Sequence, residues 1–384
     1  MSVKKFFSWF VMVSVIFGSF ELLSYAGLWF LREHRFIQYY PLDVLSEPHT
    51  NALDELISGR ADYVAHSAEL GWTLKPNGKT DLYEANSMGI RSSTEYAMSP
   101  PSGVRRISTF GDSYTHGSDV SNEDTWQAQM ERLGSNLEVL NFGVGGYGLD
   151  QAYLRYMNDG RQYGSHIVFL GYMSENLLRN VNCFRPFYVP QTGVPLAKPR
   201  FVLENEELVL VPNPMQTLDD YGRLRSRPRK TLSAIGADDY FYQAGLKSSI
   251  FDVSATFRLV KLTMFHLKPL PGDSVVSVNG YDEESEAFRV TRKIFDDFHK
   301  MAVEDGAVPV ILFLPNKGDV SRFRSHHDKR YSSLLSYFDS VGYEYIDVMD
   351  AFGDARTDDL FIGHYSPVAT ELIAKYLLAH FDTR

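Results

Sequence analysis

Cysteine is almost absent from this chain of 384 residues, in which Cys183 is the only one. A single thiol excludes an internal disulfide and a cysteine-rich metal site. An excess of positive charge is also missing, because the formal net charge is −10. A general nucleic-acid binder needs a basic face, so we expect no nucleic-acid partner. The sequence has no internal repeat and no low-complexity tract, which excludes repeat architectures.

The chain does contain one long apolar segment, at its N-terminus. Residues 6–31 are mostly apolar with Glu21 as their one charged residue, and Lys4 and Lys5 precede them. About 20 residues of helix span the hydrocarbon core of a bilayer, so this segment predicts a single-pass membrane anchor. The two lysines favour an N-terminus on the inside and an exported body. A cleaved signal peptide is the alternative, because residues 24–26 loosely match a cleavage site.

The sequence pattern divides the chain into three parts. Residues 1–35 are the predicted anchor, and residues 36–104 lack periodicity and predict a neck with an N-terminal extension. From 105 to 384 the pattern predicts one domain, which is interrupted at about 180–285 by a Pro-rich and aromatic insertion. Hydrophobic residues make up 44% and charged residues 22%, so a core of ordinary size is expected.

Strand-like and helix-like segments alternate in the third part. This alternation predicts an α/β fold in which helices cover both faces of a parallel sheet, a three-layer α/β/α sandwich. The predicted strands are residues 106–110, 137–141, 167–170, 308–314 and 343–348. The predicted helices are residues 125–133, 149–157, 287–302 and 367–381, with one more at 248–265 in the insertion.

A Gly-Asp-Ser sequence follows the first predicted strand and ends at Ser113. Glycine permits the tight turn that lifts a serine above the edge of the sheet, beside helix amides that favour negative charge. A helix N-cap serine is the structural alternative. The sequence therefore makes Ser113 a candidate nucleophile.

Glycines also follow the second predicted strand, in residues 141–148, where backbone N–H groups can approach a substrate closely. A dinucleotide-binding loop is disfavoured there, because the loop follows the wrong strand and lacks its downstream acidic residue. After the third strand comes Asn176, which is either an oxyanion donor or a cap for the next segment. Arg179 and Arg185 follow, and we expect them to bind an anionic group of the substrate.

A histidine precedes the last predicted helix. His364 follows Asp358 and Asp359, and a histidine near a carboxylate can accept a serine proton while one tautomer is held. The other histidines, including His116 and the pair at 326–327, are interpreted as surface or structural residues.

These four blocks resemble the SGNH/GDSL hydrolase superfamily, whose fold is flavodoxin-like, over residues 105–381 without the insertion. The resemblance implies that Ser113 is the nucleophile and His364 the general base. It implies oxyanion donors at the Ser113 amide, Gly146 and Asn176. The family's third block reads Gly-x-Asn-Asp, whereas this chain has Glu-Asn. The family also has Asp three residues before His, where this chain has Phe, so the expected acid is Asp359, with Asp358 or a backbone carbonyl as alternatives.

The anchored arrangement resembles bacterial envelope members of this superfamily. The resemblance implies an enzyme of the inner membrane with a periplasmic or extracellular body, which hydrolyses acyl esters, acetyl esters above all, of a glycan or lipid. O-acyl transfer to an extracellular polysaccharide needs the same residues and is an alternative. A non-catalytic scaffold that binds polysaccharide is another. We expect neither a metal nor a cofactor, and no oligomeric state is predicted.

Overall fold

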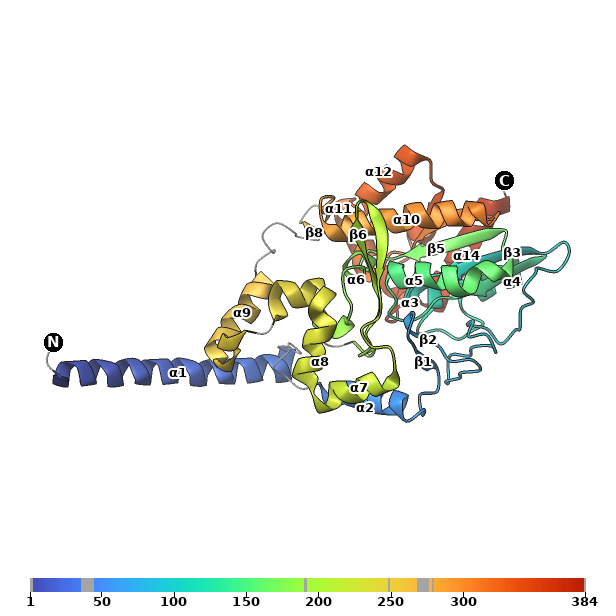
Figure 1. Ribbon diagram of the computed structural model, residues 1–384. Coiled ribbons are helices and arrows are strands. Elements are labelled where there is room, and N and C mark those ends of the chain that lie inside the picture. The colour runs from blue at the N-terminus through green and yellow to red at the C-terminus, as the bar shows by residue number, and fades with distance from the viewer. Residues whose placement is uncertain are drawn as a thin grey trace.

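Five parallel strands form the central sheet that the alternating pattern predicts (Figure 1). The computed structural model describes residues 3–35, 45–189, 192–247, 249–267, 276–277 and 280–382. The strands of the sheet are β3 (Arg105–Phe110), β4 (Leu137–Asn141), β5 (Ile167–Tyr172), β10 (Val308–Phe313) and β11 (Tyr345–Asp347). Their spatial order is β11-β10-β5-β3-β4, the flavodoxin-like order in which the first strand lies between the second and the third.

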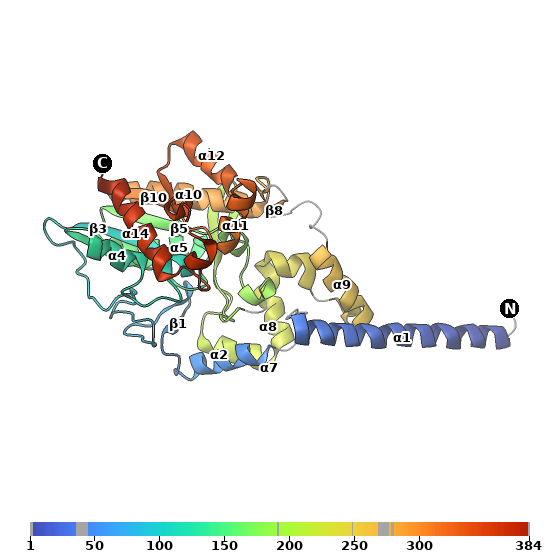
Figure 2. The same cartoon turned by 180° about the vertical axis from the view of Figure 1, so that it is seen from behind.

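Helices cover both faces of this sheet (Figures 1 and 2). On one face lie α4 (Trp126–Leu133) and α14 (Pro367–Asp382), and on the other lie α5 (Leu149–Arg155), α10 (Glu286–Glu304) and α12 (Ser332–Val341). Successive residues of a strand point to opposite faces. Accordingly, Phe169 is buried on the α4–α14 side, and its neighbours Val168 and Leu170 are buried on the other side. The predicted three-layer α/β/α sandwich is confirmed.

The predicted helices form close to their expected bounds, for local reasons. Helix α4 begins after Thr125, whose side chain accepts a hydrogen bond from the Ala128 N–H. Helix α10 begins after Ser285, which caps it through the N–H of Phe288. Pro367 occupies the first position of α14, where a missing N–H costs nothing.

The remaining elements belong to the two ends of the domain and to the insertion. They are α1 (Val3–Arg35), α2 (Glu47–Ile57), β1 (Val64–Ser67), β2 (Gly71–Leu74), α3 (Ser113–His116), α6 (Asn176–Arg179), β6 (Arg200–Glu204), β7 (Glu207–Val211), α7 (Leu218–Ser226), α8 (Pro228–Ile235), α9 (Ala255–Leu267), β8 (Val276–Ser277), β9 (Gly280–Tyr281), α11 (Lys317–His326) and α13 (Thr357–Leu360). The helix predicted at 248–265 forms as α9, seven residues later, after a short 3₁₀ turn. Ser248 and residues 36–44 of the predicted neck lie outside the described residues.

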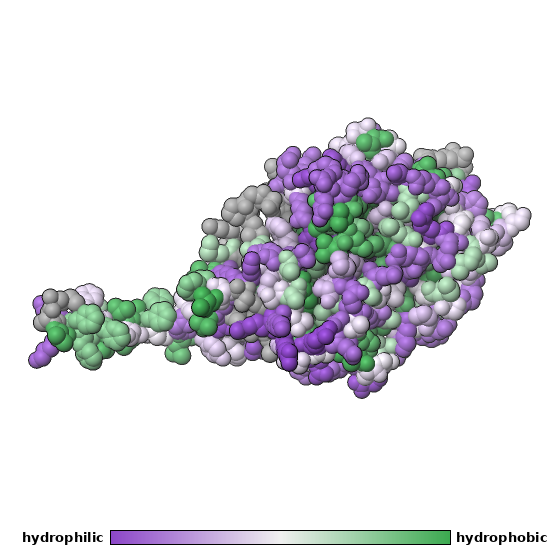
Figure 3. Space-filling view, viewed as in Figure 1, coloured by the Kyte–Doolittle hydropathy of each residue, from purple (hydrophilic) through white to green (hydrophobic). Residues whose placement is uncertain are grey.

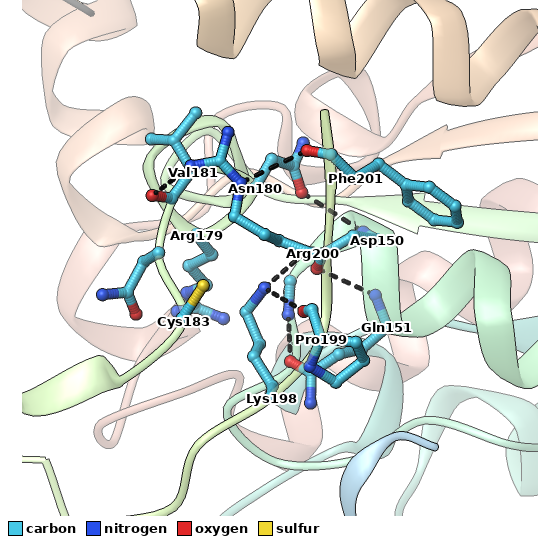
Figure 4. Close-up of polar contacts among 12 residues, drawn as sticks. Asp150, Gln151, Arg179, Asn180, Val181, Cys183, Lys198, Pro199, Arg200 and Phe201 are labelled. Carbon is cyan, nitrogen blue, oxygen red and sulfur yellow. Dashed lines mark hydrogen bonds and ion pairs between the residues drawn. The ribbon is translucent and has the colours of Figure 1, made fainter. Parts of the chain in front are cut away.

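Buried charge ties the insertion to the sheet domain (Figure 4). The Lys198 ammonium pairs with the carboxylate of Asp150 in the first turn of α5, and both side chains are almost fully buried. Arg200 donates to the Val181 carbonyl oxygen at 3.2 Å within the insertion and pairs with Glu286 at the start of α10. Removing one partner of a buried pair is strongly destabilising, because the other charge is left uncompensated. The insertion is therefore fixed to the helix that follows the glycine loop after β4.

Helix α1 projects from the body (Figures 1 and 2). Within Val3–His34, an 18-residue window has a mean hydropathy of 1.9, and this is the one described helix that is long and apolar enough to cross a membrane. Most of its apolar side chains are exposed, as the green surface in Figure 3 shows. A helix that exposes this much apolar surface is typical of a membrane span or a signal sequence.

Candidate active site

Ser113 is the first residue of α3, directly above the carboxyl end of β3. The preceding Asp112 caps this short helix, because its Oδ1 accepts a hydrogen bond from the Tyr114 N–H at 2.9 Å. Gly111 makes the turn possible, since a Cβ there would lie 2.0 Å from Thr115 Oγ1. The turn therefore holds the serine at the sheet edge, as the sequence predicts for a nucleophile.

His364 lies at the same end of the sheet. Its ring packs edge-on against the ring of Tyr114, the residue after Ser113, with 5.1 Å between the ring centroids. The loop that carries His364 ends in Ser366, whose hydroxyl donates to the carbonyl oxygen of Asp359. The structure thus brings the predicted base to the turn that presents the predicted nucleophile.

The carboxylate that contacts His364 belongs to Asp119. Asp119 Oδ2 lies 2.8 Å from His364 Nδ1 and accepts the backbone N–H of His364 at 2.9 Å. Gly363 allows this approach, because a Cβ at that position would lie 2.5 Å from Asp119 Oδ2. Partial burial alone would raise the pKa of Asp119, but the two hydrogen bonds from His364 outweigh it and lower the pKa. Asp119 is therefore held as a carboxylate at neutral pH.

This contact corrects the acid expected from the sequence. Asp358 is exposed and pairs with Lys317 at 2.9 Å. Within the described residues, neither Asp358 nor Asp359 forms a hydrogen bond with the ring of His364. The reason is geometric, because both residues lie in α13 while the Nδ1 side of the ring faces the loop after α3.

The N-terminal extension, residues 45–104, holds the loop that carries Asp119. The Tyr83 hydroxyl accepts the backbone N–H of Asp119 at 3.0 Å. The buried Arg91 guanidinium donates to the carbonyl oxygens of Gly117 and Val120, each at 2.6 Å. The Arg91 pKa is lowered to about 10, mainly by burial. Arg91 and Tyr83 of the extension thus brace the loop on which Asp119 lies.

His116 has the structural role that its interpretation predicts. Its ring is buried and contacts the Tyr63 hydroxyl at 2.9 Å and Arg91 Nη1 at 3.0 Å. Burial lowers its pKa well below the ordinary value, and the positive charge of Arg91 lowers it further. The imidazole is therefore neutral and joins α3 to the extension.

The loop after β4 presses against α3. A Cβ on Gly143 would lie 2.3 Å from the backbone nitrogen of His116, and the Val144 N–H donates to Gly111 O at 3.1 Å. Within the described chain, no hydrogen-bond acceptor is found for the N–H of Gly146 or of Ser113. Free amides beside a nucleophile are what an oxyanion requires.

Asn176 does not offer a comparable donor. Its side-chain Nδ2 donates to Asp112 Oδ2 at 3.1 Å and to the Tyr147 carbonyl oxygen at 3.2 Å. Its Oδ1 accepts the Met173 N–H at 2.8 Å. Both amide hydrogens have acceptors, so Asn176 joins the nucleophile turn to the glycine loop instead of facing a substrate.

The two arginines expected to bind substrate are also engaged within the protein. Arg179 is buried, and its Nη1 lies 3.2 Å from Asp112 Oδ2 and donates to Tyr147 O at 2.7 Å. Arg185 Nη1 donates to Gly146 O at 2.9 Å. Both guanidinium groups approach Glu175, at 3.4 and 3.7 Å. Their hydrogen bonds to the carbonyl oxygens of Tyr147 and Gly146 brace the glycine loop. The carboxylates of Asp112 and Glu175 balance their positive charge.

Burial would raise the pKa of Glu175, but Arg179 and Arg185 outweigh burial and lower it. Sequence reasoning missed Glu175 as their partner, although its spacing of four residues from Arg179 on a helical turn was a usable signal. Within the described residues, no group of three or more His, Cys, Asp or Glu side chains is arranged to hold a metal ion.

The fold and the site define a three-layer α/β/α protein in which a serine, a histidine and an aspartate gather at the carboxyl edge of the sheet. No protein-family model matches the sequence, and no curated protein matches it.

Solved structures do match. One is a member of the lipolytic protein G-D-S-L family from Veillonella parvula, with 13% identity over 73% of this chain and 99% of that chain and a TM-score of 0.34. Another is an alpha/beta hydrolase from the metagenome of Lake Arreo, with 12% identity over 72% and 94% and a TM-score of 0.37. The chain is similar to these proteins along most of their length.

Proposed function

We propose that this protein is a serine ester hydrolase that forms an acyl-enzyme on Ser113. The observation that carries the proposal is the contact of Asp119 with His364 Nδ1 beside the nucleophile turn. A carboxylate on Nδ1 holds the tautomer whose Nε2 lone pair can accept a proton from a serine hydroxyl. His364 is then the general base, and Asp119 orients it and stabilises the imidazolium.

The reaction begins when Ser113 Oγ attacks the acyl carbon and its proton moves to His364 Nε2. The carbonyl oxygen becomes an oxyanion, for which the N–H groups of Ser113 and Gly146 are the proposed donors. The intermediate collapses when the C–O bond to the alcohol breaks and His364 protonates the leaving oxygen. Water then attacks the acyl-enzyme while His364 accepts its proton, the bond between the acyl carbon and Ser113 Oγ breaks, His364 returns the proton to Ser113, and the carboxylic acid leaves.

The proposed substrates are acyl esters, acetyl esters above all, of a glycan or lipid in a bacterial envelope. The support is the apolar helix α1, on which Lys4 and Lys5 favour an inside N-terminus and a periplasmic or extracellular body. In this arrangement residues 1–35 anchor the protein and residues 105–384 carry the catalysis, with the insertion near 180–285. Neither a cofactor nor a metal takes part in the proposed steps.

Transfer of the acyl group to a polysaccharide hydroxyl is the second candidate, because the same acyl-enzyme can react with an alcohol. The scaffold alternative is less favoured in this proposal, because the contact of Asp119 with His364 Nδ1 offers the carboxylate that a catalytic histidine needs.

A serine-directed fluorophosphonate tests the proposal. We expect it to label the full-length protein in detergent at Ser113, as read by peptide mass, and to label Ser113→Ala not at all. Labelling at another serine, or equal labelling of both proteins, would refute the acyl-enzyme. Partition of a p-nitrophenyl acetate acyl group between water and added oligosaccharide then separates hydrolysis from transfer.

A further inference from the structure

Helix α9 of the insertion lies against α1 (Figure 1), and a carboxylate joins them. Glu21, in the middle of α1, accepts the backbone N–H of Ala255 at 2.7 Å and that of Thr256 at 3.3 Å. The Ser254 hydroxyl donates to the same carboxylate. Glu21 therefore caps the N-terminus of α9, where the helix dipole favours negative charge.

One stripe of α1 continues this contact toward the body. Ser24 is buried, and Leu28 and Leu31 are partly buried against the main core. A Cβ on Gly27 would lie 3.6 Å from Leu259 Cδ2 of α9. These positions recur every three or four residues and so lie on one face of a helix. The remaining faces of α1 stay apolar and exposed.

The depth of the contact follows from the sequence of α1. Trp9 and Trp29 are separated by about 30 Å of helix, which matches the hydrocarbon thickness of a bilayer, and tryptophan prefers the two membrane interfaces. Glu21 then lies about 12 Å below the level of Trp29, inside the apolar zone. A carboxylate at this depth is costly unless it is paired, and the N-terminus of α9 supplies its partners.

The residues just before α9 lie beside Glu21 and are strongly apolar. Ile250, Phe251 and Val253 are 83%, 63% and 86% exposed. On α9 itself the exposed side chains include Val260 and Met264. In Figure 3 the green surface continues from α1 onto this part of the insertion. A contiguous apolar patch at the level of the membrane span fits lipid chains.

We propose that residues 250–267 are a second membrane element, which enters the bilayer beside α1 and contacts lipid acyl chains through its exposed apolar face. Lipid is the occupant because the patch is continuous with the lipid-facing surface of α1. This second membrane element requires that α1 spans the membrane, and it does not depend on the proposed acyl-enzyme at Ser113. It also accounts for an uncleaved anchor, because cleavage after Ala26 would remove the carboxylate that caps α9.

Depth-dependent fluorescence quenching tests the inference on the full-length protein in phosphatidylcholine nanodiscs. Val253→Cys carries an environment-sensitive dye, and the lipids carry nitroxides on their acyl chains. Two exposed positions serve as controls: Val15→Cys in α1, where the native side chain is 62% exposed, and Leu210→Cys in β7, where it is 42% exposed. The native thiol, Cys183, is buried, so the unmutated protein provides the labelling blank.

We expect the dyes at positions 253 and 15 to lose most of their fluorescence to the nitroxides, and the dye at 210 to be quenched by aqueous iodide instead. If position 15 is quenched by lipid and position 253 only by iodide, the second membrane element is refuted while the anchor stands. In unlabelled Val253→Cys, a disulfide between two copies, together with no lipid quenching of the dye-labelled protein, assigns the patch to a second copy and also overturns the inference.

Glu21→Ala in the Val253→Cys background tests the cap. We expect the dye to become less quenched by lipid and more by iodide, because α9 loses the acceptor that holds it at this depth. Ser19→Ala on an exposed face of α1 is the matched control and should change neither reading. Thermal unfolding by circular dichroism checks that each variant is folded. Unchanged quenching in folded Glu21→Ala would refute the role given to Glu21.

Discussion

The carboxyl edge of the sheet and the N-terminal extension meet at one site, yet they are built in different ways. The edge consists of short turns that follow strands, and it presents Ser113 and Gly146. The extension is largely irregular, and it acts through Tyr83 and Arg91 on the loop of Asp119. Turns that follow regular strands therefore place Ser113 and Gly146, while the irregular extension holds the loop whose carboxylate contacts His364.

The largest expected effect comes from the sheet edge. Ser113→Ala removes the hydroxyl that forms the acyl-enzyme, and we expect kcat for p-nitrophenyl acetate to fall on the order of 10⁴-fold or more. Initial rates with the purified full-length protein give this value. Unchanged melting temperature in the variant shows that the loss is chemical. A residual rate within tenfold of the wild type would place the nucleophile elsewhere.

The next effect concerns the acid held by the extension. Asp119→Asn keeps the shape of the side chain but removes the charge that holds the His364 tautomer, so we expect kcat to fall on the order of 10⁴-fold. Asp359→Asn is the matched control and should keep nearly wild-type kcat, because His364 already has Asp119 on Nδ1. An equal loss in Asp359→Asn would restore the acid expected from the sequence.

Asp359, the acid expected from the sequence, and Asp119, the carboxylate that contacts His364, show which features the sequence can predict. Each strand of the sheet and the Gly-Asp-Ser turn follow from local patterns, because burial on two faces and a tight turn leave clear signals in a few residues. Asp119 and His364 are 245 residues apart, and their contact depends on tertiary packing. Spacing near His364 therefore pointed to Asp359. The available signal was a carboxylate six residues after Ser113, in the loop that leaves its helix.

The hydrogen-bond partners of Asn176 could not be predicted from the sequence for a similar reason. Its position after the third strand suits an oxyanion donor, but the direction of its amide depends on Asp112 and Tyr147, which lie in two other loops. The charge balance of Arg179 likewise depends on Glu175 and Asp112. A pattern along the chain gives the place of a side chain, whereas its partners come from the assembled fold.

A smaller effect concerns His116, which joins α3 at the sheet edge to the N-terminal extension. His116 is buried with a lowered pKa, so as pH falls below about 6.5 the unfolded state binds a proton that the folded state does not. Stability should therefore decrease as pH falls, by up to about 1.4 kcal/mol per pH unit from this group. Denaturant unfolding at pH 7.5, 6.5 and 5.5 measures the slope.

His116→Gln should lower stability at pH 7.5 but make this slope shallower, because the titrating group is gone. His326→Gln, at an exposed position of α11, should leave the slope unchanged. If the slope in His116→Gln equals that of the wild type, other groups cause the acid sensitivity. Protonation of His116 would then not weaken the contact between α3 and the extension.

The smallest expected effect tests the extension itself. Tyr83→Phe removes the hydroxyl that accepts the Asp119 N–H and keeps the ring that packs against Arg91. A hydrogen bond of this kind contributes about 0.5–1.5 kcal/mol, so we expect kcat to fall roughly two- to tenfold while KM changes little. Tyr96 lies in the same extension, and its hydroxyl bonds to Ser92 and Glu131 instead, so Tyr96→Phe should leave kcat unchanged. Equal kcat in the wild type and Tyr83→Phe would mean that the loop keeps its geometry without this contact, through Arg91 and the other contacts between the extension and this loop.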